Sequence, residues 1–136
     1  MANLTIVATA VKYVKGDDGN QMTAPAGVAI EAGNVVTFDN TTKRWILSGA
    51  SDAGELGDPF IALVTVEASR ALTAVKAPAW LDLGEALASL NFGAKVYVSD
   101  DAGELADAAG TVSKVAGTVV PGFGATTPDK LLRVDL

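Results

Sequence analysis

Apolar residues in this chain occur in short runs that alternate with polar positions, and turn-forming residues separate the runs. Val96 and Val98 share one face of an extended segment, for example, while Lys95 and Tyr97 share the other. Fourteen glycines and five prolines interrupt the chain, and few windows keep a helical period for three turns. The pattern predicts an all-β fold with strands over residues 4–13, 35–39, 44–48, 60–67, 72–83, 94–99, 103–106, 112–120 and 130–136.

One segment favours a helix. Residues 84–91 contain a run of Glu, Ala and Leu, which are good helix formers. We therefore predict at most one short helix, over residues 84–91, and a tight connection between strands is the alternative.

The segment around Gly33 is repeated in similar form 60 residues later, around Gly93. In both copies a glycine precedes an alternating strand, an Asp or Asn begins a turn, and a second strand follows, so each copy predicts a β-hairpin. The next apolar segments, residues 60–64 and 114–118, also correspond loosely. We predict a compact, sandwich-like or barrel-like body built from two related hairpin units, too few for a solenoid.

Composition narrows the possible functions. The 136 residues suit one domain, and 49% are hydrophobic. The chain contains no histidine and no cysteine, which excludes Ser-His-Asp and Cys-His nucleophiles and the usual zinc sites. We expect no enzymatic activity, no cofactor and no metal.

The charge and hydropathy of the chain indicate which kinds of partner to expect. The net charge is −6, and the ten basic residues are dispersed between Lys12 and Arg133, so we expect no nucleic-acid binding. No segment approaches the roughly 20 apolar residues of a membrane span, and the N-terminus lacks the basic residues of a signal peptide. We expect no membrane association and no cleaved leader.

The carboxylates form the one cluster capable of chemistry. Residues 52–58 nearly repeat as residues 101–107, at an offset of 49 that disagrees with the hairpin offset of 60. We therefore expect the two copies to lie in different structural places. Neither follows the calcium-loop spacing, and we favour solvated turns over a calcium site or a catalytic pair.

The two tryptophans have two interpretations. Trp45 lies in a predicted hairpin and Trp80 follows Pro78. We favour packing in the core or at a subunit interface, with sugar stacking as the alternative.

The N-terminal 20 residues differ from the remainder, because one long alternating stretch ends in the turn-rich residues 16–20. They form either the first strand of the body's own sheet or an extended arm that adds a strand to a partner. We therefore divide the chain into residues 1–20, arm or first strand, and residues 21–136, a single β domain.

Several segments resemble one family in the same order. The run Ala32-Gly33-Asn34-Val35-Val36, after a Pro-x-Gly turn within residues 23–27, resembles the opening of small capsid cement proteins of tailed phages, also called head decoration proteins. Residues 90–103, 115–119 and 131–136 resemble their second hairpin and final strands, and residues 39–45 and 61–64 are loosely similar to lambdoid decoration proteins. The resemblance covers residues 21–136.

The resemblance implies a compact β body, often a trimer, that seats on the outside of an expanded phage head without an enzymatic step. Its partner would be the major capsid protein, and its location the virion, after synthesis in the host cytoplasm. A ligand that binds only the mature lattice stabilises that lattice by mass action.

On this hypothesis the arm residues Leu4, Ile6, Val7 and Val11 are the candidates for capsid contact. We expect that deleting residues 2–15 leaves a folded body that no longer binds heads. Trp80 and Phe123 are the candidates for a subunit interface. The alternative functions are a carbohydrate-binding β module and a tail or baseplate structural protein.

Overall fold

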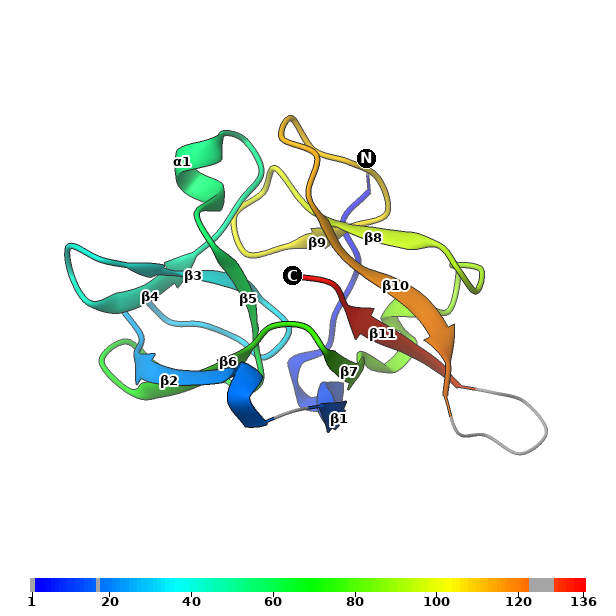
Figure 1. Ribbon diagram of the computed structural model, residues 1–136, viewed down its shortest axis with the longest axis horizontal. Helices are drawn as coiled ribbons and strands as arrows, with labels where there is room; N and C mark the ends of the chain where they lie inside the picture. The colour runs from blue at the N-terminus through cyan, green and yellow to red at the C-terminus, as the bar shows by residue number, and fades with distance from the viewer. Residues whose placement is uncertain (1, 17, 123–128) are drawn as a thin grey trace.

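The computed structural model describes residues 2–16, 18–122 and 129–136. Strands dominate this part of the chain and form two antiparallel sheets (Figure 1). One sheet contains, in order, β2 (Gln21–Pro25), β6 (Ala71–Val75), β5 (Pro59–Ala62), β3 (Val35–Asp39) and β4 (Arg44–Leu47). The other contains β1 (Lys12–Gly16), β7 (Ala79–Asp82), β11 (Lys130–Val134), β10 (Val115–Pro121), β8 (Lys95–Val98) and β9 (Leu105–Ala106). The predicted all-β fold is confirmed.

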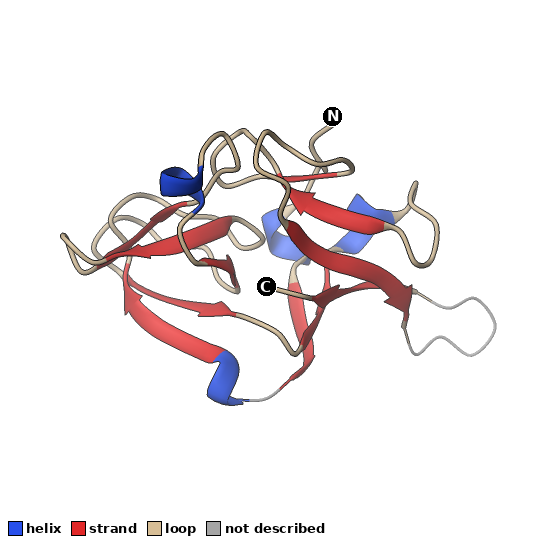
Figure 2. Cartoon of the chain, turned by 45° about the horizontal axis from the view of Figure 1, so that its top comes forward, coloured by secondary structure: helices blue, strands red, loops and turns tan. Residues whose placement is uncertain are grey.

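Helical structure in the described residues is confined to short turns (Figure 2). They are the helix α1 (Ala53–Leu56) and the 3₁₀ turns η1 (Ala8–Ala10), η2 (Asp18–Asn20) and η3 (Gly84–Leu87). The predicted helix over 84–91 is therefore only the 3₁₀ turn η3. The helix α1 was not predicted, although its capping signal is present: the Asp52 carboxylate accepts a hydrogen bond from the Glu55 amide at 2.7 Å.

The two sheets repeat one topology. The strand order β2-β6-β5-β3-β4 becomes β7-β11-β10-β8-β9 when five is added to each number. In each unit a hairpin, β3–β4 or β8–β9, is followed by a strand that pairs with the first strand of that hairpin. Figure 1 shows the two units as lobes lying side by side. The prediction of two related hairpin units is confirmed, and we call them lobe one (β2–β6) and lobe two (β7–β11).

Backbone hydrogen bonds fix the equivalence of the lobes. The Gly33 amide donates to the Ala62 carbonyl at 2.9 Å, and the Gly93 amide donates to the Val119 carbonyl at 2.8 Å. In both lobes the amide of the second residue bonds back to the carbonyl that follows the glycine. The hairpins therefore match at the predicted offset of 60, whereas the next strands match at 57, three residues from the predicted alignment of 60–64 with 114–118.

Lobe one closes on itself. After β2 the chain continues to Ala26, which forms a parallel bridge with Trp45 of β4, and the Gly27 amide donates to the Trp45 carbonyl at 2.7 Å. The Trp45 side chain is fully buried, its Nε1 donates to the Leu72 carbonyl at 3.1 Å, and two phenylalanine rings meet it edge-on. Lobe one is thus a small barrel around an aromatic core.

Lobe two is closed by the N-terminal segment, residues 2–16, which we call the strap. Asn3 forms an antiparallel bridge with Ala106 of β9, and the Leu4 amide donates to the Leu105 carbonyl at 2.8 Å. At its other end the strap becomes β1, which pairs with β7. The strap therefore joins the two edges of lobe two.

This arrangement decides between the two alternatives for the N-terminal segment and corrects two predicted strands. The segment supplies β1, a strand of the body's own sheet, and is not an extended arm. The strand predicted over 4–13 is a bent path through η1 that becomes a strand only at Lys12. The alternating pattern of residues 4–13 arises because single apolar side chains of this bent segment pack against the core. The strand predicted over 72–83 is two strands, β6 and β7, in different sheets.

Candidate interaction face

Five side chains lie in one line across five strands of the six-stranded sheet. Lys15 on β1 pairs with Trp80 on β7, and Trp80 pairs with Arg133 on β11. Arg133 pairs with Thr118 on β10, and Thr118 pairs with Lys95 on β8. Directly paired residues point to the same side of a sheet. We call these five residues the cross-strand row.

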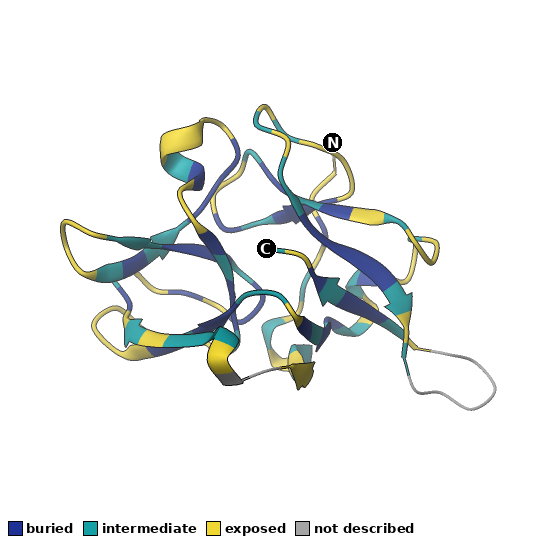
Figure 3. Cartoon of the chain, viewed as in Figure 1, coloured by how far each residue is buried: buried dark blue, intermediate teal, exposed yellow. Residues whose placement is uncertain are grey.

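Strand alternation places the row on the outer face. Leu81, Leu132 and Val96 are the neighbours of row residues along their strands, and all three are fully buried in the core. Successive side chains of a strand point to opposite faces, so the row faces away from that core. Figure 3 shows that the middles of β10 and β11 are buried, whereas the edge strand β1 is mostly exposed.

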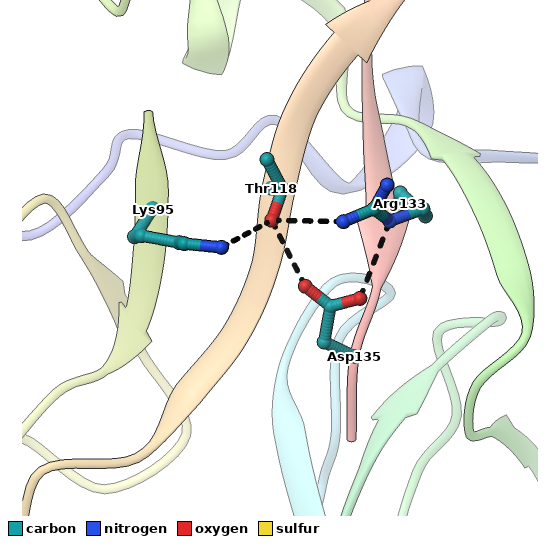
Figure 4. Close-up of polar contacts among 4 residues, drawn as sticks. All are labelled: Lys95, Thr118, Arg133 and Asp135. Atoms are coloured by element: carbon teal, nitrogen blue, oxygen red, sulfur yellow. Dashed lines mark hydrogen bonds and ion pairs between the residues drawn. The ribbon is translucent and has the colours of Figure 1, made fainter. Parts of the chain in front are cut away.

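Thr118 is the centre of a polar network (Figure 4). Its hydroxyl accepts from Lys95 Nζ at 3.3 Å and from Arg133 Nη2 at 3.4 Å, and it donates to Asp135 Oδ2 at 2.9 Å. Arg133 Nε also lies 3.3 Å from Asp135 Oδ1. One carboxylate thus balances one of the three cations in the row.

A cation–π contact holds the other end of the row. Lys15 Nζ lies 5.1 Å from the centroid of the Trp80 ring, a distance at which the ring quadrupole attracts the ammonium. Trp80 itself is partly buried. Neither Lys15 nor Lys95 has a carboxylate within ion-pair distance in the described part of the chain.

The candidate capsid-contact residues do not form one surface. Leu4 is buried in the core, with 8% of its surface exposed, so it is not available for docking in this conformation. Ile6 and Val11 pack against lobe one, because a methyl group on Gly33 would lie 2.8 Å and 3.2 Å from their Cγ2 atoms. Only Val7, which is 58% exposed, projects into solvent.

The structure also places the two tryptophans. Trp80 belongs to the cross-strand row, where an interface role stays a prediction. Trp45 is fully buried, which supports the packing interpretation and removes it as a sugar-stacking platform. The second interface candidate, Phe123, lies outside the described residues.

The two acidic repeats occupy different places, as expected. Asp52 caps α1 between β4 and β5. Asp101 and Asp107 instead hold the start of the strap: Asn3 Nδ2 donates to Asp101 at 2.7 Å, and the Ala2 amide donates to Asp107 at 3.0 Å. No group of three potential metal-ligating side chains occurs within residues 2–16, 18–122 and 129–136.

A hollow of about 420 Å³ lies where loops of the two lobes meet, and Glu31, Glu67 and Glu104 contribute to its walls. Partial burial raises the pKa of Glu104, and the nearby charges of Asp101 and Glu31 raise it further. Acidic walls of this kind disfavour an anionic ligand. Sequence reasoning did not find the hollow, because its residues come from separate loops.

Sequence reasoning also missed most of the cross-strand row. Lys95 and Arg133 were visible as polar positions within alternating strands. Their alignment depends on the order and register of strands that are distant in sequence, and alternation within one strand carries no such information.

Comparison of the chain with protein-family models, curated proteins and solved structures produced no match. The helices found in the described residues are all too short to cross a membrane.

Proposed function

We propose that this chain is a structural cement protein of a tailed-phage head, which binds the outer surface of the mature capsid and stabilises the lattice by bridging capsid subunits. The observation that carries the proposal is where the family-like segments lie. The run from Ala32 to Val36 leads into β3, and the similar run from Phe92 leads into β8. The resemblance thus follows the duplicated framework of the body.

The cross-strand row supports a docking role. Trp and Arg are among the side chains most enriched where protein interfaces gain their binding energy, and the row places Trp80 beside Arg133, both partly exposed. Binding that occurs only on the mature lattice lowers the free energy of that lattice by mass action. Repetition over many copies then opposes rupture of the shell.

The partner in this proposal is the major capsid protein, and the assembled form is a homotrimer. Sedimentation equilibrium of the purified protein tests the second statement. We expect a mass about three times the 13.8 kDa of one chain. A single-chain mass at all concentrations would contradict the trimer.

Quantitative mass spectrometry of purified particles tests the function itself. A ratio to the major capsid protein near one-to-one is expected of a lattice-wide cement protein. A ratio tens of times lower would indicate a vertex, tail or baseplate protein. Absence from the particles would overturn the proposal.

A carbohydrate-binding module is the second candidate, because Trp80 is partly exposed on the outer sheet face. Lys15 occupies one face of its ring, which leaves less aromatic surface for a sugar. On a glycan array we expect no signal from the native protein. A signal that disappears in Trp80→Ala but persists in Trp80→Phe would favour this candidate.

A further inference from the structure

The outer face of the six-stranded sheet differs in charge from the chain as a whole. The net charge of the chain is −6, yet Lys15, Arg133 and Lys95 lie in one row across five strands. Asp135 contacts Arg133 alone among these cations. Among the described residues, the two lysines at the ends of the row have no carboxylate within ion-pair distance.

The row is also held in place before any partner arrives. Lys15 lies over the Trp80 ring, and Lys95 donates to the Thr118 hydroxyl. Binding immobilises long side chains at a cost in conformational entropy, and side chains that are already restrained lose less. A row of restrained cations next to an aromatic ring therefore suits a specific anionic partner.

The spacing of the strands sets the size of that partner. Four strand intervals separate β1 from β8, which corresponds to roughly 19 Å along the sheet. An extended peptide covers that distance with about six residues. Two acidic side chains so separated would reach Lys15 and Lys95, while the middle of the segment crosses Trp80 and Arg133.

We propose that the cross-strand row binds an extended acidic segment of a partner protein, with carboxylates on Lys15 and Lys95 and the intervening backbone over Trp80. Charge complementarity selects this occupant. A nucleic acid fits less well, because its continuous negative charge would meet Asp135 beside the row and the net charge of −6 around it. The inference rests on the proposed function only in taking the capsid subunit as the partner.

Fluorescence anisotropy with the full chain at low salt tests the proposal. The probe is a labelled peptide of about seven residues with glutamate at both ends and Gly and Ser between them, and the matched probe has glutamine at both ends. We expect the glutamate peptide to bind and the glutamine peptide to bind at least about fivefold more weakly. Added salt should weaken the binding of the glutamate peptide.

Charge-reversal variants locate the binding. Lys15→Glu combined with Lys95→Glu should weaken binding of the glutamate peptide about tenfold, since it removes two ion pairs and adds two repulsions. The control Arg70→Glu reverses a single charge, half the change of the double variant, at an exposed turn of lobe one, and it should alter binding less than about twofold. Thermal melts of the variants check that all remain folded.

Three results would overturn the proposal: equal binding of the two peptides, an equal loss in Arg70→Glu, or tighter row-dependent binding of a single-stranded DNA of matched length. Addition of wild-type and row-variant protein to heads that lack it separates this inference from the proposed function. If both proteins bound heads equally well, the row would not be the binding site for the capsid subunit, and the cement role would stand. If the protein were absent from particles but still bound the peptide through the row, the cement role would be refuted, and the proposal that the row binds an acidic segment would stand.

Discussion

The two lobes share one topology but complete their cores in different ways. In lobe one Trp45 occupies the second strand of the hairpin, and the equivalent residue in lobe two is the smaller Leu105, since Phe38 pairs with Trp45 as Val98 pairs with Leu105. Lobe one closes with its own chain. The strap adds Leu4 to the core of lobe two, and the Leu4 amide donates a hydrogen bond to the Leu105 carbonyl. A repeated framework thus tolerates a smaller core residue when another segment supplies the missing volume.

The two hairpins also differ in their surroundings. The turn of the β8–β9 hairpin docks on lobe one: the Gly103 carbonyl accepts from the Val35 amide at 2.9 Å, and the Gly103 amide donates to the Ser48 carbonyl at 2.7 Å. The corresponding turn of lobe one, residues 40–43, is exposed. One hairpin has become the joint between the lobes and the other faces solvent, so equivalent substitutions should have unequal effects.

Loss of the aromatic core should have the largest effect. Trp45→Ala is expected to lower the free energy of unfolding by about 3–5 kcal/mol, because it leaves a large cavity and removes the hydrogen bond to the Leu72 carbonyl. Trp45→Phe keeps part of the volume and should cost less. Denaturant titrations followed by circular dichroism measure both. A loss below about 1 kcal/mol for Trp45→Ala would contradict an essential aromatic core.

Truncation within the strap should have the next largest effect. Leu4→Ala is expected to cost about 2–3 kcal/mol, whereas Val7→Ala, at a position 58% exposed, should change stability by less than about 0.5 kcal/mol. Amide hydrogen exchange should show the loss of protection concentrated at β9. The expected stable body after deletion of residues 2–15 is revised, because that deletion removes Leu4 and opens an edge of lobe two. Equal effects of the two alanine variants would restore the arm interpretation.

Much of the framework follows from local pattern. The strand over 35–39 was predicted with its observed bounds, because alternation and a flanking glycine are local signals. The strand β2 was missed, since its sequence Gln-Met-Thr-Ala-Pro has little alternation and its pairing with β6 comes from residues 50 positions away. The path of the strap was missed for the same reason, because its partners on β9 lie about 100 residues along the chain.

The candidate site was less accessible from sequence than the fold. Trp80 was singled out as an aromatic residue, but its cationic neighbours come from strands whose order emerges only in the folded sheet. The acidic repeats gave the clearest chemical pattern, and they serve as caps and anchors. Residue type alone does not separate these roles, whereas the partner of each carboxylate does.

Equivalent glycines in the two lobes provide a smaller and sharper comparison. Gly33 and Gly93 have φ angles of +91° and +86°, so alanine at either position costs about 1 kcal/mol of backbone strain. At Gly93 an added methyl group has no neighbour within 4 Å in the described structure, but at Gly33 it lies 2.8 Å from Ile6 Cγ2. We expect Gly33→Ala to be worse by about 1 kcal/mol.

A double variant identifies the cause of this difference. Ile6→Ala should recover most of the additional cost of Gly33→Ala and none of the cost of Gly93→Ala, because only the first methyl group meets the strap. Thermal unfolding of the three single variants and the two double variants measures the coupling. Additive effects in both pairs would show that the strap does not press on lobe one.

The smallest predicted effect concerns the titration of two carboxyl groups, Asp39 and Glu104, one in each hairpin. The pKa of Asp39 is lowered by hydrogen bonds from the Thr41 amide and the Thr42 hydroxyl. The stabilisation from this carboxylate is therefore present above its unfolded pKa and lost as the pH falls through the folded pKa. Asp39→Asn should lose stability at neutral pH relative to wild type, and the difference should narrow on acidification.

Glu104 should behave in the opposite sense. Burial, Asp101 and Glu31 raise its pKa, so its stabilising form is the protonated one, present below the unfolded pKa and lost as the pH rises through the folded pKa. Glu104→Gln should therefore match wild type in acid and be slightly more stable than wild type at pH 7, a small difference because solvent screens a partly exposed group. Melting curves from pH 3.5 to pH 7 measure both variants. If both substitutions changed the stability at pH 7 in the same direction, the two hairpins would impose the same electrostatic environment on their carboxyl groups, contrary to their packing.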